Sequence, residues 1–515
     1  MNKLRFLLIP ALSLGAFAAS AQDVTEAYNL SNLTVQGTAR SMGFGNALGS
    51  VGGDFGSVSV NPAGLGIYRM SEFTFTPSLR INSASSSYLG STTADNNTHF
   101  NINNFGMVFT NAPKGKRYEK RNWKAVSFAF GMNRVADFNR NYTYKGTNYS
   151  SSATQTFEAD ANQYPDDPYS NVPLTVPGYL GYRSFLINYN SAAGQFTSAV
   201  PFQGGVNQIK TAKQNGHIDE YAFSLGGNYK EKLMLGATLG IPSVSYHLLY
   251  TYSESLAQGN TMANPSSFAY FNYNQSFDIT GGGINLKLGA IYKITDNIRI
   301  GGSFHSPTVY SLTDVYTPYV RSVAGGYDNV ISTTNGGTIT NQFNYSFTTP
   351  WRGILSGTYI FKGIGFITAD YEYVGYNSMR YIYPVDDGFG NSYQSQESAI
   401  NQSIQDTYKG TSNFRVGAEA LITKFFMARA GFGYYGNAYK NGINDAQRMD
   451  ISGGLGFRSQ YFFADIALVH SMYKSQFQPY SIDYAFVHSS GPAAAPVANT
   501  DFNINNIALT VGVKF

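Results

Sequence analysis

The chain has 515 residues, a formal net charge of +4, 54 glycines and no cysteine. Without cysteine it can form neither disulfides nor thiolate metal sites, and so small a net charge gives no reason to expect a nucleic-acid partner. Aromatic residues make up 15% of the chain and charged residues only 13%, which is unusual for a soluble enzyme and suits strands that face lipid.

The first 21 residues have the layout of a secretory signal peptide. Lys3 and Arg5 form a basic start, residues 6–18 are apolar, and residues 19–21 are small, as at a cleavage site. The apolar run is too short for a membrane-spanning helix, which needs about twenty apolar residues, and no later segment supplies such a run. We therefore expect residues 1–21 to be a signal peptide.

Residues 22–70 are rich in glycine and show no sustained strand pattern. A phosphate-binding loop is a poor interpretation, because no G-K-[ST] follows the glycines and no βαβ unit surrounds them. Such a glycine density suits a backbone that packs closely inside a lumen. Within the segment, Asn61-Pro62-Ala63-Gly64 predicts a rigid turn, because Asn can bond its own backbone and Pro fixes φ.

From residue 71 onward, polar and apolar residues alternate with the period of a β-strand. In the first such run, Phe73, Phe75 and Leu79 fall on one face, and Thr74 and Arg80 fall on the other. The pattern predicts fourteen strands, at 71–82, 99–110, 123–145, 216–229, 233–252, 277–294, 298–316, 341–361, 365–383, 408–422, 425–436, 448–457, 461–474 and 501–515.

The gaps between these runs alternate between very short and long. Short gaps lie at 230–232, 295–297, 362–364, around 423–424 and at 458–460, and the longest loop is 146–215. A bacterial outer-membrane barrel has short periplasmic turns and long extracellular loops. The predicted fold class is therefore all-β: a transmembrane antiparallel β-barrel over residues 71–515, with strands long enough to project beyond the membrane. A barrel of this size needs a plug, and residues 22–70 are the candidate for this N-terminal hatch inside the lumen.

Several of these motifs resemble the FadL-type outer-membrane transporters of hydrophobic compounds, a family that includes the long-chain fatty-acid transporter and the TodX-type hydrocarbon channels. The turn with Asn61, Pro62, Ala63 and Gly64 is similar to the hatch motif of that family. Further matches follow in order at 289–292, 305–307, 369–373, 415–419 and 429–434, so the resemblance covers nearly the whole mature chain. The insertion at 146–215 departs from the family pattern.

The resemblance implies a fourteen-stranded barrel with a hatch, an outer groove, an inner apolar pocket and lateral release into the membrane near a kinked third strand. In the third predicted strand, Gly131 and Asp137 are the candidate kink residues, since glycine in a strand often marks a bend. Packing against the plug would explain Gly131 equally well. The chain ends on Phe515, which resembles the signal read by the barrel-assembly machinery, although an ordinary last strand is the alternative.

Apolar plug residues are the candidates for a ligand pocket, with packing against the barrel wall as the competing interpretation. They are Met42, Phe44, Leu48, Phe55 and Leu65. Arg40 would meet a ligand carboxylate, or else form a salt bridge with Asp54 or with an acid that faces the lumen.

Together these features predict an outer-membrane channel for passive uptake of hydrophobic small molecules such as long-chain fatty acids or hydrocarbons. We expect a monomer in contact with outer-membrane lipids and lipopolysaccharide, with no cofactor, metal or nucleic acid. The six histidines show no zinc-binding spacing, so no enzyme is expected, although His can meet Ser or Asp across strands. The alternatives are an accessory or shuttle barrel of a protein-secretion system and a hemin-binding receptor.

Overall fold

The computed structural model describes residues 24–113, 115–163, 176–260, 268–331, 333–334, 337–338, 341–386, 392–440, 444–489 and 495–515. The predicted signal peptide therefore lies outside the described residues, as does part of the long loop, 164–175.

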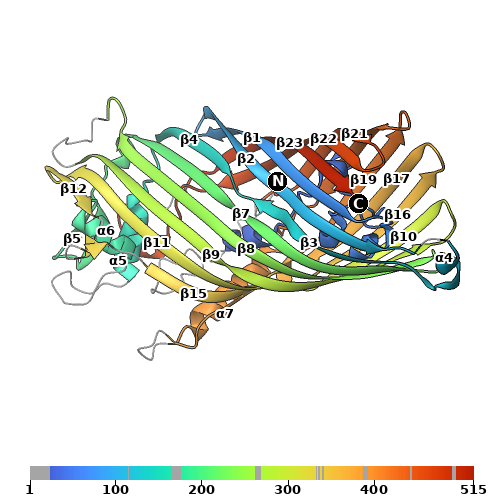
Figure 1. Cartoon of the computed structure of the whole chain (residues 1–515). Coiled ribbons are helices and arrows are strands. Elements are labelled where there is room, and N and C mark those ends of the chain that lie inside the picture. The colour runs from blue at the N-terminus through green and yellow to red at the C-terminus, as the bar shows by residue number, and fades with distance from the viewer. Residues whose placement is uncertain are drawn as a thin grey trace, which may run out of the picture.

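Fourteen antiparallel strands form a closed barrel, which confirms the predicted fold class and strand number (Figure 1). The wall closes because β1 pairs with both β2 and β23. Four of the fourteen consist of two segments each. In order around the wall the strands are β1 (Glu72–Tyr88), β2 (Ser91–Asn111), β3 (Trp123–Asp137) with β4 (Arg140–Asn148), β7 (Val206–Tyr229), β8 (Leu233–Leu256), β9 (Phe268–Lys293), β10 (Ile298–His305) with β11 (Val309–Ala324), β15 (Asn341–Thr348) with β16 (Arg352–Phe361), β17 (Gly365–Gly375) with β18 (Arg380–Ile382), β19 (Gly410–Leu421), β20 (Phe426–Tyr435), β21 (Arg448–Arg458), β22 (Phe462–Phe477) and β23 (Ala498–Lys514).

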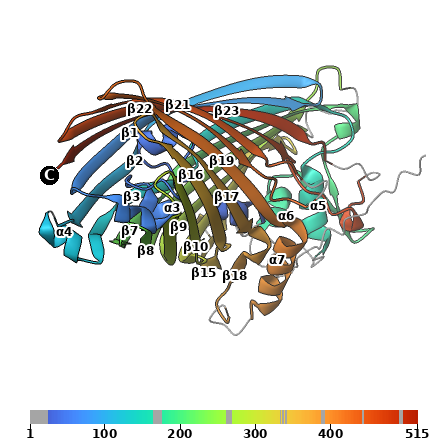
Figure 2. The ribbon, with the colours of Figure 1, turned by 90° about the vertical axis from the view of Figure 1, so that its right-hand side faces the viewer.

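The two ends of the barrel differ, as the alternating gaps predict. One end, here called the turn end, carries the short turns, α4 (Lys116–Lys120) and the C-terminus (Figure 2). At the turn between β7 and β8, Lys230 and Glu231 both have positive φ, 54° and 60°, which fits the twist of a tight hairpin. The opposite, loop end carries α5 (Thr154–Gln163), α6 (Val176–Arg183), β5 (Ile187–Asn190), β6 (Gln195–Ser198) and β12 (Tyr327–Ile331), and α7 (Gln394–Thr407) lies on the same half (Figures 1 and 2).

The outer surface of the wall is apolar and the inner surface is polar. On β8, Leu235 and Leu239 are exposed, whereas Thr238 between them is completely buried. The same arrangement, with apolar residues outside and polar residues inside, recurs around the wall. The exposed residues include Ile284, Leu286, Leu288, Leu355, Leu455, Ile466, Leu468 and Leu509. A surface of this kind would aggregate in water, and it matches the apolar band that a barrel presents to lipid.

Among the described residues, no helix is both long and apolar enough to cross a membrane.

The segment before β1 fills the lumen. It forms α1 (Val24–Ser31), α2 (Ala39–Gly43), α3 (Ser57–Val60) and the 3-10 helix η1 (Pro62–Ile67). Figure 1 shows these blue helices within the barrel. Helix α2 contacts β20 to β23, whereas η1 contacts β3 and β7 to β9. Because these strands lie on different sides of the wall, the segment spans the lumen as a plug.

Glycines in the wall bring the plug backbone into direct contact with the strands. A Cβ atom at Gly236 would lie 2.3 Å from the carbonyl carbon of Pro62, and one at Gly289 would lie 2.0 Å from Oδ1 of Asn61. At Gly301 it would lie 2.2 Å from the carbonyl oxygen of Gly49. These distances are too short for any side chain, so the wall accommodates the plug only because these residues are glycines.

Several strand boundaries differ from the sequence prediction: β9, for example, begins at Phe268 rather than at 277, and β11 ends at Ala324 rather than at 316. Residues 83–98, expected as a loop, continue β1 and β2 as a long hairpin that turns at Leu89 and Gly90, where φ is 47° and 82°. Strand β7 begins at Val206 rather than at 216. The added part of the β1–β2 hairpin projects at the loop end and is rich in Ser, Thr and Asn. Its outward face meets water beyond the lipid, so no apolar residues are needed on that face.

Candidate ligand cavity and lateral seam

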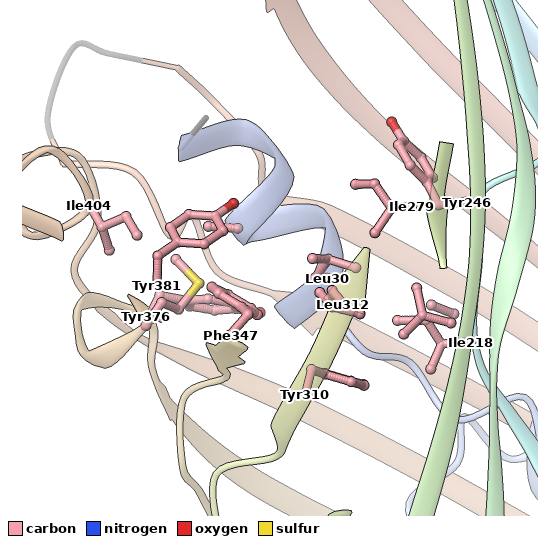
Figure 3. Close-up of a cluster of buried hydrophobic side chains, with 14 of the residues drawn as sticks. Leu30, Ile218, Tyr246, Ile279, Tyr310, Leu312, Phe347, Tyr376, Tyr381 and Ile404 are labelled. Carbon is pink, nitrogen blue, oxygen red and sulfur yellow. The ribbon is translucent and has the colours of Figure 1, made fainter. Parts of the chain in front are cut away.

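A large apolar cluster fills the lumen around α1 (Figure 3). Leu30 of α1 lies near its centre, and the other residues come from α1, the wall, α7 and the segments that follow β17 and β20. The labelled members are Leu30, Ile218, Tyr246, Ile279, Tyr310, Leu312, Phe347, Tyr376, Tyr381 and Ile404. This cluster ties α1 to the wall, so that α1 is a fixed part of the plug.

Beside this cluster lies a cavity of about 450 Å³, which is within the range of small-molecule sites. It is bounded by α1, by the junction of β3 and β4, and by β21 to β23. Its lining combines polar side chains with seven aromatic rings: Tyr28, Phe138, Tyr250, Phe277, Tyr439, Tyr473 and Phe477. A cavity with this lining can hold apolar carbon while leaving room for a polar group at specific places.

Arg140 brings a guanidinium group to the cavity. Its Nη1 donates to Oη of Tyr473 at 3.0 Å, its Nε donates to Gln214, and its guanidinium lies 5.5 Å from the centre of the Phe502 ring. Within the described part of the chain, no carboxylate forms an ion pair with Arg140. Arg448, which also lines the cavity, is by contrast paired with Asp450 at 3.1 Å.

The barrel wall is interrupted next to this cavity. β2 pairs with β3 from Asn104 to Asn111 only, and β4 pairs with β7. The third strand shifts its register between Arg134 and Ala136 and breaks between β3 and β4. Over the described residues, no backbone ladder joins residues 91–103 of β2 to residues 140–148 of β4. We call this interruption the lateral seam.

Side chains close the lateral seam in place of the backbone ladder. The Asp95 carboxylate on β2 accepts hydrogen bonds from the backbone N–H of Thr143 at 2.6 Å and from its hydroxyl at 3.2 Å. Asp137 lies 3.1 Å from Nε2 of His99 and accepts from Nδ2 of Asn101 at 2.5 Å. Because such side-chain bonds can be exchanged without breaking a backbone ladder, the two strands at the lateral seam are held together less firmly than strands that a ladder joins.

The predicted kink residues have different environments. Asp137 ends β3 at the break and lines the cavity. Gly131 lies on the turn-end side of the break, where an added Cβ would come within 2.6 Å of the ring of Phe55 in the plug. Of the two interpretations offered for Gly131, its surroundings favour packing against the plug.

The predicted pocket residues are divided between the cavity and the contact of plug and wall. Met42 lines the cavity. Phe44 and Leu48 are completely buried in one cluster with Ile354 of the wall, and Phe55 and Leu65 are completely buried in another. Arg40 donates through Nε to Glu419 of β19 at 3.0 Å, an acid that faces the lumen.

The hatch motif anchors the plug to two strands of the wall. Asn61 caps η1 by accepting from the N–H of Ala63 at 3.1 Å, and its Nδ2 donates to the carbonyl of Gly49 at 2.6 Å. The same amide reaches the carbonyls of Ala290 in β9 and Gly302 in β10 at 3.2 and 3.3 Å. Asn at this position thus joins the turn, the plug and the wall.

Most of the residues that line the cavity were not predicted from the sequence. Arg140, Tyr473 and Tyr28 come from β4, β22 and α1, and no local motif marks any of them. The only available signal was the pair of polar residues Asp137 and Asn139, which interrupt the third strand immediately before Arg140. Among the described residues, no group of three or more His, Asp or Glu side chains could hold a metal ion.

At the loop end, α5, α6 and the β5–β6 hairpin form a cap that shares one apolar core with the ends of β7, β8, β9 and β11. Leu180, Leu186 and Ile187 are completely buried in it. Asp160 of α5 accepts from the N–H of Gly178 at 2.8 Å. Burial raises the pKa of its carboxyl from 3.8 to about 6.

The raised pKa of Asp160 predicts that the cap is most stable in acid. Because the folded form holds the proton more tightly, the stabilisation is complete below the unfolded pKa of 3.8 and is lost as the pH rises through about 6. Hydrogen exchange of α5 and α6 should therefore be faster at pH 7 than at pH 4 after correction for intrinsic rates. Asp160→Asn should remove this difference, and an unchanged pH dependence in the variant would contradict the assignment.

Solved structures share this fold over nearly its whole length. A Pseudomonas aeruginosa FadL homologue matches with a TM-score of 0.57 and 13% identity, over 94% of this chain and 99% of that one. The deltaS2 mutant of the TodX monoaromatic hydrocarbon channel matches with 0.50 and 11%, over 93% and 99%. The Ralstonia pickettii toluene transporter TbuX gives 0.48 and 14%, over 93% and 98%. No protein-family model and no curated protein matches the chain. The structural likeness confirms the FadL-like fold, an outer-membrane type of barrel with an N-terminal plug.

Proposed function

We propose that this protein is an outer-membrane channel for passive uptake of hydrophobic small molecules that carry an acidic group, such as long-chain fatty acids, with release through the lateral seam. The observation that carries the proposal is the cavity that joins an aromatic lining to Arg140 and to the seam. In outer-membrane barrels short turns face the periplasm and long loops face outward, which would place the cap outside the cell.

The driving force in this proposal is the hydrophobic effect. Moving an alkyl chain out of water contributes about 0.8 kcal/mol per CH₂ group, so neither ATP nor a cofactor is required. The aromatic rings of the cavity receive the chain. The Arg140 guanidinium pairs with the acid, since an Arg–carboxylate hydrogen bond is stronger than a neutral one.

The release route follows from the position of the cavity beside the lateral seam. Residues 136–140 line the cavity and also form the break between β3 and β4. A ligand that leaves through the part of the seam beside Asp137, where Phe100 and Ile102 of β2 are exposed on the outer face, enters the hydrocarbon of the bilayer directly, so it does not pass the plug or return to water.

Arg140→Gln should weaken fatty-acid binding about tenfold, because a charge-assisted hydrogen bond is replaced by a neutral one. Binding of a radiolabelled fatty acid to purified barrels measures this effect, and uptake by bacteria that lack their own fatty-acid channel measures its consequence. An aromatic hydrocarbon without a charge should bind equally to both proteins.

Arg321→Gln is the matched control, because Arg321 is exposed at the loop end and paired with Asp328 at 3.2 Å. It should bind and transport as the unaltered protein does. Fatty-acid affinity that is the same in Arg140→Gln and in the control would refute the role of Arg140. If neither fatty acid nor hydrocarbon enters cells through the unaltered barrel, the transport proposal itself fails.

The role of Phe515 as an assembly signal stays a prediction. Phe515 lies at the turn end, 62% exposed, and its backbone N–H donates to the carbonyl of Ser71 at 3.0 Å.

A further inference from the structure

A second cavity, the inner-mouth cavity, opens at the turn end between the plug and the wall. It has a volume of about 390 Å³. The plug contributes Arg40, the backbone of Gly52 and Gly53, and Arg69, while the wall contributes Arg299, Arg458 and Lys514. The plug lies between the inner-mouth cavity and the ligand cavity. The two cavities share no lining residue.

The inner-mouth cavity carries more positive than negative charge. Five of its lining residues are Arg or Lys, and two, Glu72 and Glu419, are acids. Glu419 already has two cationic partners, because it accepts from Arg40 at 3.0 Å and from Arg429 at 2.7 Å. Glu72 lies 3.7 Å from Nζ of Lys514 and also accepts from the Tyr68 hydroxyl at 3.0 Å. Arg69 is paired with Glu231 outside the cavity at 2.9 Å.

Two arginines of the inner-mouth cavity have no acidic partner within 4 Å in the described part of the chain. Arg299 donates through Nη1 to the carbonyl of Val51 at 3.0 Å, and its Nε is buried without a hydrogen-bond partner. The Nε of Arg458 is also buried without a partner. Buried guanidinium N–H groups left unpaired cost free energy, so an acceptor at this place would stabilise the site.

Arg458 and Lys514 of the inner-mouth cavity both pack against the same aromatic ring. The guanidinium of Arg458 and Nζ of Lys514 each lie 5.6 Å from the centre of the Phe463 ring, and Phe463 itself is buried. Like charges brought together on one ring repel each other, and a bound anion removes that repulsion. The cation–π contacts fix the positions of the two side chains and leave their N–H groups able to donate to an anion.

From this arrangement we propose that the inner-mouth cavity binds a phosphate group, with Arg458 and Lys514 as its principal ligands, because both cations lie on the Phe463 ring. A phosphate offers several acceptor oxygens, so it can accept from a guanidinium and an ammonium group at once. The group can belong to free phosphate or to the headgroup of an anionic phospholipid in the inner leaflet.

The test measures thermal stability of the full barrel in detergent, with phosphate or with chloride at equal ionic strength. Phosphate should raise the melting temperature in a saturable manner, and Arg458→Gln and Lys514→Gln should each weaken the apparent affinity about tenfold. Arg321→Gln, at the opposite end, should respond as the unaltered protein. Heat-modifiable migration on gels shows that each variant is folded.

A second arm distinguishes the two sources of the phosphate group. Barrels in nanodiscs of phosphatidylglycerol or of phosphatidylcholine are compared for lipid retained after transfer to detergent, by native mass spectrometry. Saturable stabilisation by free phosphate assigns the site to the free ion, and retention of phosphatidylglycerol that both Gln variants abolish assigns it to the lipid. If phosphate acts no differently from chloride and no lipid is retained, or if the Gln variants match the control, the proposal is overturned.

Discussion

Gly236→Val is expected to displace the plug and make the barrel conduct ions. A Cβ atom at this position would lie 2.3 Å from the carbonyl carbon and oxygen of Pro62 and 2.5 Å from the backbone nitrogen of Ala63. All three are backbone atoms, so no side chain can rotate to relieve the clash. Overpacking of this kind costs about 1–3 kcal/mol or more, and here the simplest relief is movement of η1 away from β8. Planar-bilayer recordings should show frequent open steps where the unaltered protein is largely closed.

The barrel offers a matched control for this substitution at Gly357 in β16. A Cβ there meets no atom within 4 Å, so Gly357→Val adds the same side chain to a strand without touching the plug. Its conductance should equal that of the unaltered protein. A folded Gly236→Val barrel that stays as closed as Gly357→Val would show that η1 does not depend on this contact.

The strand number was predictable because each strand that crosses the lipid must show an apolar outer face. Leu286 and Leu288 alternate with Lys287 for this reason, and short gaps such as 230–232 mark where neighbours join. The same rule explains the error at residues 83–98. Once the strands leave the lipid their outward side chains can be Ser, Thr or Asn, so the β1–β2 hairpin carries no alternation and reads as a loop.

The location of the plug was predictable but the position of the cavity was not. Glycine density identified residues 22–70 as a segment packed in a lumen, and Asn61 identified its turn. The cavity, however, depends on which side chains of distant strands converge. Arg140 meets Tyr473 across 333 positions of sequence, and such a pair leaves no trace in a local pattern. Phe44 and Phe55 are predicted pocket residues because they are apolar. Residues that pack against the wall must also be apolar, so the sequence does not distinguish the two roles.

Bridging the lateral seam is expected to abolish uptake while leaving ligand binding intact. The chain contains no cysteine, so the paired substitutions Asp95→Cys and Thr143→Cys introduce the only two thiols. The side chain at 95 reaches the backbone and hydroxyl of residue 143 at 2.6 and 3.2 Å, close enough for a short bifunctional thiol reagent. Fatty-acid uptake should fall to the background rate once the bridge forms, whereas binding to the purified barrel should stay within about twofold, because neither residue lines the cavity.

The control places the same bridge between β7 and β8, two strands that backbone hydrogen bonds already join. Asn207 on β7 and Ser255 on β8 are directly opposite each other, so Asn207→Cys with Ser255→Cys should leave uptake unchanged after bridging. The comparison separates two routes. A ligand that leaves laterally must separate β2 from β4, and the bridge blocks it. A ligand that passes along the barrel axis must displace the plug, and the bridge does not affect it. Undiminished uptake through the bridged seam would therefore assign transport to the axial route and make the plug, with its glycine contacts, the moving element.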